Sequence, residues 1–429
     1  MRSFREYPKS AFVDPARMLR LQTQWLRQHL AYCQAASPFY RKFFQKHGIV
    51  PRAVTLENLA DIPLTDKRCL ERSNRDFIAV PQERIADIVL SSGTTGDPTQ
   101  IVYTQRDLDR LAYNERQSMA SCGIVAADRV LLTCTIDRCF VAGLAYYLGA
   151  KTIGAACIRN GLNSLESHAG IIKLMAPTVI VGVPSFLRKL GNYVEHKKIS
   201  VASVKKLVCI GEPLRDKEMK PLAVTRDLEA VWKAKAYSTY SSSEMVTSFC
   251  ECKSQNGGHL HPELAVAEIV DERGRRVSAG VPGELVVTPL GMEGMPLVRF
   301  RTGDISFMLE EPCACGRCSP RLGPILGRKK QMLKVKGTTV YPLAVFSALD
   351  ALPEVSDYYL TVFAADALSD RLTVTVSLRG PCSLARISEV LTARLRVAPE
   401  VVVASEDDVR RVVYNPSLRK PVRFFDRRS

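Results

Sequence analysis

Hydrophobic positions at the start of the chain recur every three to four residues, the spacing of an amphipathic helix, and residues 15–26 (PARMLRLQTQWL) show it clearly. From about residue 85 the pattern changes to short unbroken apolar runs that alternate with helix-like segments. The runs lie at 130–134, 178–183 and 207–211. Unbroken apolar strands separated by helices are typical of a parallel sheet with helices on its faces.

Two further changes of pattern divide the rest of the chain. Residues 264–308 carry strand and turn signals, which predict a more antiparallel module. Later segments predict a small α/β unit, and they lie at 340–352, 358–364, 372–378 and 384–395. We therefore predict an α/β fold with a large domain, residues 1–327, of parallel-rich sheets, flanking helices and the antiparallel module, and a small C-terminal α/β domain, residues 328–429.

Length and composition indicate an ordinary globular protein of more than one domain. The chain has 429 residues, of which 46% are hydrophobic and 24% are charged, and this length exceeds what one compact core usually holds. No run of 18 apolar residues predicts a membrane span, and the N-terminal segment lacks the apolar core of a signal peptide. Thirteen cysteines without a secretion signal predict a cytoplasmic protein, where thiols stay reduced or bind metal.

The formal net charge of +16 indicates a basic surface, for which there are three interpretations. A basic surface can bind nucleic acid, but the chain has no long Lys/Arg run interleaved with aromatic residues. It can also steer anionic small molecules such as ATP and CoA, or an acidic carrier protein. The third alternative is a solvated basic face without a partner. The motifs of the chain favour the anionic small molecules, and the oligomeric state stays open.

One loop concentrates hydroxyl groups and glycines at the end of the apolar run 85–90. The loop SSGTTG consists of Ser91, Ser92, Gly93, Thr94, Thr95 and Gly96. Glycines let backbone N–H groups turn toward an anion, and the hydroxyls add donors, so the loop suits a polyphosphate. After the loop, Thr104 is the predicted N-cap of a helix. The Gly-Lys-Ser/Thr ending of a Walker-type loop is missing, and a flexible surface turn is the alternative.

This loop resembles the signature of the adenylate-forming superfamily, which includes acyl-CoA synthetases, luciferases and the adenylation domains of peptide synthetases. Its wording SSGTTGxPT is most similar to the phenylacetate-CoA ligase branch. Segments that resemble further motifs of the superfamily follow in the family's order, at 211–213, 240–244, 301–304, 327–337 and 415–423. Each segment alone could be a polar turn, and the resemblance depends on their common order.

The resemblance implies a nucleotide site with one loop that follows the predicted strand 207–211. Gly211, Glu212 and Pro213 correspond to the family's loop on the adenine side, and strand ends in open α/β sheets are where ligands collect. Tyr240 and Ser241 open the second segment, which lies by the nucleotide in the family. Ser241 stands where the family usually has glycine.

The same resemblance assigns the groups that hold the phosphates and the ribose. Ser243 would contact the α-phosphate, and Glu244 would hold Mg²⁺, a cation that needs few protein ligands beside the ATP oxygens. Asp304 in the segment RTGD would accept hydrogen bonds from both ribose hydroxyls. Arg328 would contact ribose or phosphate.

The resemblance also implies a hinge and a catalytic lysine in a mobile small domain. Lys330 stands at the family's hinge, where many members carry an acidic residue. Lys420 corresponds to the lysine that reaches the α-phosphate during adenylation, and Arg419 and Arg423 are alternatives for this role.

The activity implied by the resemblance is ATP-dependent conversion of a small carboxylic acid to an acyl-adenylate, followed by transfer to a thiol. An aryl acid:CoA ligase is the leading hypothesis, with residues 136–147 and 183–186 as the acid pocket. Arg138 would bind a second anionic group or take part in an ion pair. The alternatives are transfer to the phosphopantetheine of an acyl carrier protein, nucleotidyl transfer to a deazaflavin-type cofactor, and a non-catalytic nucleic-acid-binding protein.

Cysteines and histidines predict a separate structural zinc site. The proposed ligands are Cys252, His259, Cys313 and Cys315. Thiolates with an imidazole suit tetrahedral zinc, and some phenylacetate-CoA ligase relatives carry a similar set. The remaining candidates are Cys250, Cys318 and, in place of His259, His261. A cluster of reduced thiols without metal is the alternative.

Overall fold

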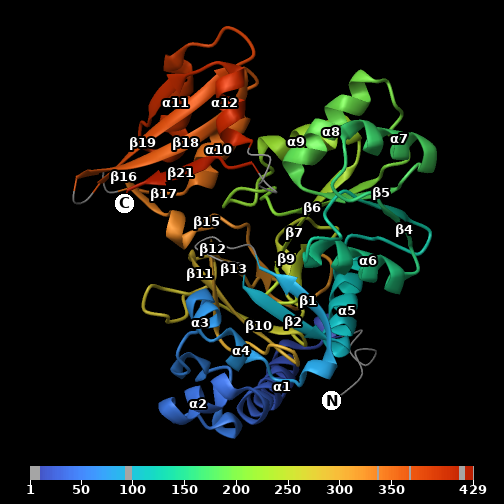
Figure 1. Cartoon of the computed structure of the whole chain (residues 1–429), viewed down its shortest axis with the longest axis vertical. Helices are drawn as coiled ribbons and strands as arrows, with labels where there is room; N and C mark the ends of the chain where they lie inside the picture. The colour runs from blue at the N-terminus through green and yellow to red at the C-terminus, as the bar shows by residue number, and fades with distance from the viewer. Residues whose placement is uncertain (1–9, 92–98, 336–337, 367–368, 415–420, 429) are drawn as a thin grey trace. The chain divides into compact units, whose positions relative to one another are not determined.

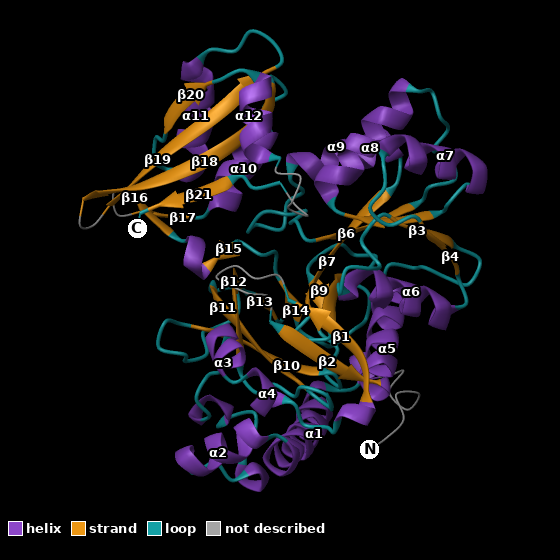
Figure 2. Cartoon of the chain, viewed as in Figure 1, coloured by secondary structure: helices purple, strands orange, loops and turns teal. Residues whose placement is uncertain are grey.

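The computed structural model describes residues 10–91, 99–335, 338–366, 369–414 and 421–428. The chain divides into two compact units. Unit 1 comprises Met1–Lys220, Thr225–Thr302 and Ser306–Pro324, and unit 2 comprises Pro221–Val224, Gly303–Ile305 and Ile325–Ser429, with the exception of the residues outside the described ranges. Figure 1 follows the chain by colour, and Figure 2 shows that both units mix helices and strands.

Unit 1 contains a nine-stranded sheet with the order β13-β14-β9-β8-β7-β6-β5-β3-β4. Its parallel strands are β3 (Arg129–Leu132), β4 (Ala156–Arg159), β5 (Val179–Gly182), β6 (Lys206–Ile210) and β7 (Lys235–Ser242). The connecting helices are α6 (Val141–Ile153), α7 (Leu165–Met175), α8 (Pro184–His196) and α9 (Ala223–Trp232). Every residue of β5 is buried, as expected for a strand covered on both faces. The strands predicted at 130–134, 178–183 and 207–211 are confirmed.

Beyond β7 the same sheet becomes antiparallel. The further strands are β8 (Thr247–Glu251), β9 (Gly258–His259), β13 (Met308–Leu309) and β14 (Arg321–Leu322). The short turn 243–246 reverses the chain between β7 and β8. Helices α5 and α6 pack on the face of the sheet that carries Val130, Val181 and Tyr237 (Figure 1).

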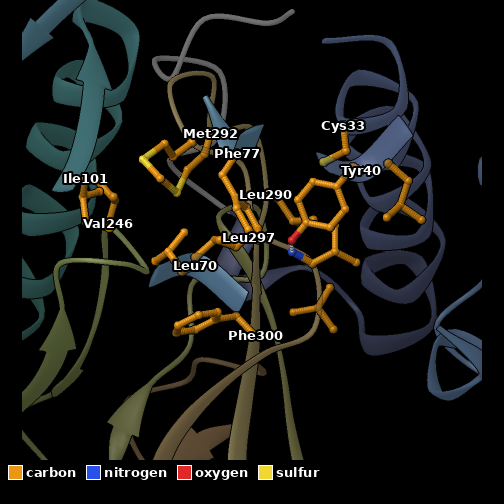
Figure 3. Packing of buried hydrophobic residues seen from close by; sticks show 14 of the residues in the cluster. Cys33, Tyr40, Leu70, Phe77, Ile101, Val246, Leu290, Met292, Leu297 and Phe300 are labelled. Atoms are coloured by element: carbon orange, nitrogen blue, oxygen red, sulfur yellow. Dashed lines mark hydrogen bonds between the residues drawn. The ribbon is translucent and has the colours of Figure 1, made fainter. Parts of the chain in front are cut away.

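A second sheet confirms the predicted antiparallel module. It has the order β10-β11-β12-β15, with β10 (Ala265–Val270), β11 (Gly283–Pro289), β12 (Phe300–Ser306) and β15 (Gly327–Arg328). The N-terminal helices are α1 (Pro15–Ala36), α2 (Pro38–His47), α3 (Lys67–Arg72) and α4 (Asn74–Phe77), and α1 contains the helix predicted at 15–26. Tyr40 and Phe77 of these helices pack with Leu297 and Phe300 in one apolar cluster (Figure 3).

A two-stranded hairpin carries the predicted phosphate loop. β1 (Ile85–Leu90) and β2 (Gln100–Thr104) pair antiparallel, and α5 (Gln105–Ser121) begins directly after β2. Thr104 accepts a hydrogen bond from the Asp107 backbone N–H, and Asp107 accepts one from the Thr104 backbone. This capping box confirms the predicted helix start.

Unit 2 contains the small α/β fold predicted for the end of the chain. Its helices are α10 (Pro342–Asp350), α11 (Leu384–Leu395) and α12 (Glu406–Val413). Its main sheet has the order β20-β19-β18-β21, with β18 (Val355–Asp366), β19 (Ser369–Leu378), β20 (Glu400–Val403) and β21 (Phe424–Arg427). A hairpin of β16 (Leu333–Val335) and β17 (Thr338–Val340) precedes it. Within the described parts of both units, no helix has the length and apolar character needed to span a bilayer.

Candidate active site

The predicted phosphate loop falls between β1 and β2 in the sequence, and Ser91 is its one residue within the described ranges. The Ser91 backbone N–H donates to the carbonyl oxygen of Thr99 at 2.9 Å, which extends the pairing of the two strands by one hydrogen bond. The side-chain hydroxyls of both residues are buried and make no hydrogen bond with any residue that the structure describes. Buried hydroxyls are normally paired, so these two are available to a ligand or to the loop itself. The other loop residues, Ser92, Gly93, Thr94, Thr95 and Gly96, lie outside the described ranges.

Tyr103 joins this hairpin to the segment predicted to bind Mg²⁺. Its buried hydroxyl donates to the carbonyl oxygen of Ser243 at 2.7 Å. Burial, reinforced by the nearby Glu244 carboxylate, raises the pKa of Tyr103, so the hydroxyl stays protonated and remains a donor. The strand that leaves the phosphate loop and the 240–244 segment therefore lie side by side, although sequence analysis did not single out Tyr103.

The 240–244 segment spans the end of β7 and the turn that follows. Tyr240 and Ser241 are on the strand, and the Ser241 hydroxyl donates to the Thr247 carbonyl oxygen at 2.7 Å. Ser243 is buried in the turn, whereas Glu244 is half-buried. A half-buried carboxylate beside the phosphate hairpin suits a magnesium ion, which takes oxygen ligands and keeps several waters. The geometry is compatible with the predicted role of Glu244.

A buried arginine on α5 supports this turn. Arg110 donates to the carbonyl oxygen of Leu290 at 3.0 Å and also to those of Val246 and Leu264. Val246 ends the turn that carries Glu244. Arg110 was not among the residues predicted from the sequence. The sequence does contain a signal for it: Arg110 follows Asp107 at the spacing of one helical turn, so both side chains lie on the same buried face of α5.

The loop 211–213, predicted for the adenine side, is hydrogen-bonded to the segment 183–186, predicted for the acid pocket. Gly211 has φ of +76°, a conformation that glycine adopts without strain. The next residue, Glu212, accepts from the Ser185 backbone N–H at 2.9 Å and from the Ser185 hydroxyl at 2.7 Å. Ser185 is in the first turn of α8, so the carboxylate caps this helix and complements its dipole. The Glu212 side chain thus has a structural role that the sequence did not predict.

The two residues predicted to contact the ribose are neighbours. Asp304 of β12 and Arg328 of β15 are directly opposed across the sheet, with 3.2 Å between Asp304 Oδ1 and Arg328 Nε. Asp304 is largely buried, whereas half of the Arg328 side chain is exposed. Lys330 follows in a 3-10 helix (Lys329–Gln331). The predicted catalytic lysine, Lys420, lies outside the described residues.

The four predicted zinc ligands form one cluster in unit 1. The nearest ligand atoms of Cys252, His259, Cys313 and Cys315 all lie within 4.8 Å of one another. The Cys252 and Cys313 sulfurs are 3.7 Å apart, and His259 Nε2 is 3.4 Å from the Cys315 sulfur. Zinc–sulfur bonds of about 2.3 Å in a tetrahedron require similar separations. The donor set and its geometry therefore fit a zinc ion.

The surroundings of His259 favour a metal ligand. Burial, aided by two nearby arginines, lowers the pKa of His259 to about 4, so the imidazole is neutral at pH 7. Its other nitrogen, Nδ1, lies 3.2 Å from the Ser319 hydroxyl, which orients the ring.

The other candidate ligands have different surroundings. The Cys250 sulfur lies 3.3 Å from that of Cys122, and His261 Nε2 lies 3.1 Å from the Ser118 hydroxyl. Cys318 is exposed. None of these three candidates belongs to the cluster of four found among the described residues.

The family model for "AMP-binding enzyme" matches residues 41–293. This range is more than half of the chain, and it contains the phosphate hairpin, the 211–213 loop and the 240–244 segment. The chain belongs to the AMP-binding enzyme family. The resemblance to adenylate-forming enzymes is therefore confirmed at the level of the family.

Individual relatives of this AMP-binding enzyme are phenylacetate-coenzyme A ligases. The chain is 31% identical over 383 residues to the one from Thermus thermophilus, a match that covers 87% of this chain and 84% of the relative. It is 30% identical to the one from Pseudomonas putida, with the same coverage. A solved 2-hydroxyisobutyryl-CoA ligase, in complex with 2-HIB-AMP, has the same fold, with a TM-score of 0.86 at 22% identity over 98% of this chain and 92% of that chain.

Proposed function

We propose that this AMP-binding enzyme is an AMP-forming acid–thiol ligase that activates a small carboxylic acid with ATP and transfers the acyl group to CoA. The hydrogen bond between Tyr103 and Ser243 is the observation that carries the proposal. It joins β2, the strand that follows the predicted phosphate loop, to the predicted Mg²⁺ segment in a chain that aligns with phenylacetate-coenzyme A ligases over most of its length. An aryl acid is the leading substrate class, and the cytoplasm is the expected location.

The first step overcomes the poor leaving group of a carboxylate, which would have to depart as oxide. A carboxylate oxygen attacks the α-phosphorus of ATP, a new O–P bond forms, and the bond to pyrophosphate breaks. The protein's contribution is positioning and charge neutralisation. The loop 91–96 and Ser243 would bind phosphate oxygens, and Lys420 would reach the α-phosphate. Mg²⁺, held by Glu244, would supply positive charge.

In the second step the CoA thiol attacks the acyl carbon. A C–S bond forms, the bond from carbon to AMP breaks, and the thiol proton passes to solvent. We expect the small domain, residues 328–429, to turn about Lys330 between the steps, a rigid-body change of a common kind. The phosphopantetheine of a carrier protein is the alternative acceptor.

The zinc site completes the proposal. Cys252 and His259 lie around β8 and β9, and Cys313 and Cys315 lie in the connection between β13 and β14. These strands are neighbours in the large sheet. A closed four-ligand zinc site would therefore hold two connections of the sheet together and leave no open position for catalysis.

Pyrophosphate release with a panel of aromatic and short aliphatic acids, with and without CoA, tests the proposal. We expect release that depends on the acid, and an acyl-CoA product only when CoA is present. Glu244→Gln should raise the Mg²⁺ concentration needed for half-maximal rate, whereas the exposed Glu310→Gln should not. Lys420→Ala should lower adenylation far more than acid binding.

Three results would overturn parts of the proposal. Absence of ATP turnover with every acid would reject the ligase, and a steeply salt-dependent affinity for DNA in the same preparation would favour the nucleic-acid-binding alternative. Transfer to a carrier protein but not to CoA would change the acceptor. Nucleotide transfer to a deazaflavin without thioester formation would change the reaction.

A further inference from the structure

The turn that carries Glu244 is held by a buried side chain at each of its ends. At its start, the Tyr103 hydroxyl donates to the carbonyl oxygen of Ser243 at 2.7 Å. At its end, the Arg110 guanidinium donates to the carbonyl oxygen of Val246. Glu244 is half-buried and lies between these two positions in the chain. The place of the proposed Mg²⁺ ligand therefore depends on a short piece of backbone that both donors hold.

Arg110 joins this turn to the second sheet of unit 1. The side chain is completely buried, and besides Val246 it donates to the carbonyl oxygens of Leu264 and, at 3.0 Å, of Leu290. Leu264 directly precedes β10, and Leu290 directly follows β11. A guanidinium presents its N–H groups in a rigid planar fork. One side chain thus fixes the turn against two neighbouring strands.

Val246 has a backbone conformation that its own side chain opposes. Its φ is +49°, in the left-handed region, where a β-branched residue is an outlier. Residues in such conformations persist only where their surroundings hold them, and they are concentrated at functional sites. Val246 is 2% exposed and belongs to the apolar cluster that also contains Leu290 (Figure 3). The hydrogen bond from Arg110 is a contact that holds this residue.

We propose that Arg110 is a positioning residue for the Mg²⁺ ligand, because it holds Val246 in the left-handed conformation and so keeps Glu244 in place. Without the fork of donors, Val246 would relax toward an ordinary φ. Glu244 is only two residues away, so its carboxylate would move with the backbone. The inference rests on the proposed ligase function and adds to it a residue that acts only through the turn.

A second buried arginine of unit 1 offers a matched comparison. Arg299 is also buried, and it donates to the carbonyl oxygens of Ala60 at 2.8 Å and of Ile62 at 2.6 Å. It forms an ion pair with Glu268 at 3.0 Å. None of these partners belongs to the turn. Loss of its donors should therefore lower stability without affecting the Mg²⁺ ligand.

Arg110→Lys tests the inference in the purified full-length protein, because lysine keeps the charge but not the planar fork. ATP–pyrophosphate exchange is measured across a range of Mg²⁺ concentrations. We expect the half-maximal rate to need at least about tenfold more Mg²⁺ than in the wild type, with KM for the acid unchanged. Arg299→Lys should leave the Mg²⁺ requirement unchanged.

Substitutions at Val246 separate backbone strain from packing. Val246→Gly removes the Cβ that opposes the left-handed conformation, whereas Val246→Ala also removes most of the side chain but keeps the Cβ. Added to Arg110→Lys, Val246→Gly should lower the Mg²⁺ requirement again by on the order of fivefold. Val246→Ala should not, since alanine keeps the tendency of the turn to relax.

Two measurements need no activity. Hydrogen exchange of the backbone amides at 243–246 should be faster in Arg110→Lys than in the wild type, and slower again once Val246→Gly is added. In the otherwise unchanged protein, Val246→Gly should have a denaturation midpoint no lower than that of Val246→Ala, although glycine buries less apolar surface. This comparison decides the matter even if Arg110→Lys does not fold, because a higher midpoint for alanine would overturn the inference.

The other outcomes separate this inference from the ligase function. An unchanged Mg²⁺ requirement in Arg110→Lys, or an equal increase in Arg299→Lys, would overturn the role of Arg110 and leave the ligase function standing. Equal rescue by glycine and alanine at position 246 would do the same. Absence of ATP turnover by the wild type with every acid would overturn both proposals.

Discussion

The hydroxyl group of Tyr103 lies 2.7 Å from the carbonyl oxygen of Ser243, although 140 positions separate them in the sequence. Tyr103 is on the strand that leaves the predicted phosphate loop. Ser243 opens the turn that carries Glu244. One hydrogen bond therefore joins the strand that follows the predicted phosphate loop to the turn that carries Glu244.

Removal of this hydroxyl should reduce catalysis more than stability. In Tyr103→Phe the Ser243 carbonyl loses its partner, and the free energy of unfolding should fall by about 1–3 kcal/mol. The turn would lose its hydrogen bond to β2, so we expect ATP–pyrophosphate exchange to slow about ten- to a hundredfold. Tyr113→Phe is the matched control, because Tyr113 is a buried tyrosine whose hydroxyl donates to Glu263 at 2.9 Å and not to the 240–244 segment. Equal slowing in both variants would contradict a specific role for Tyr103.

The contact between Glu212 and Ser185 should couple the nucleotide loop to the acid segment. Glu212→Ala removes the cap of α8, and we expect a loss of about 1–2 kcal/mol of unfolding free energy. KM should rise for both ATP and the acid, since the carboxylate joins both segments. Combination with Ser185→Ala in a double-mutant cycle should give a coupling of at least about 0.5 kcal/mol. Strict additivity in chemical denaturation would show that the two residues act independently.

Zinc content can be tested without an activity assay. The double variant Cys313→Ser, Cys315→Ser should lose one equivalent of zinc by elemental analysis. Its melting temperature should fall by at least about 5 °C, because the site holds two connections of the sheet. Cys318→Ser should keep the metal and the melting temperature, since Cys318 is exposed and outside the cluster. Unchanged zinc in the double variant would remove the claim.

Glu115 should make stability fall as the pH rises. Its pKa is raised from 4.5 to about 7 in the folded protein by burial, so the folded state holds a proton between these values that the unfolded state has lost. Stability from this group is therefore present at pH 4.5 and below and is lost as the pH rises to about 7, by on the order of 3 kcal/mol. The neighbouring Cys134, Tyr146 and Cys250 have raised pKa values and stay neutral over this range.

Glu115→Gln isolates this effect from the histidines that also titrate. The amide does not ionise, so the variant should gain stability relative to the wild type as the pH increases from 5 to 8. Denaturant melts of both proteins across this range give the difference directly. A constant difference would mean that Glu115 has an ordinary pKa in the folded state.

Local sequence patterns predicted most of the elements and the family. Apolar runs predicted the strands at 130–134, 178–183 and 207–211, and Thr104 as an N-cap predicted the start of α5. Burial on both faces and capping depend on near neighbours in the chain, which is why these predictions succeeded. The order of the motifs was sufficient to identify the family. The sequence proposed the zinc set but left Cys250, His261 and Cys318 as alternatives, since spacing does not say which side chains point to one centre.

Only the tertiary structure revealed the contacts that arrange the site. The hydrogen bonds of Tyr103 with Ser243 and of Glu212 with Ser185 each join elements far apart in the chain. Their positions depend on strand register, on the packing of α5 and α6 against one face of the sheet, and on complete burial. The local sequence around a buried polar residue does not indicate its hydrogen-bond partner, because that partner depends on how the whole unit packs.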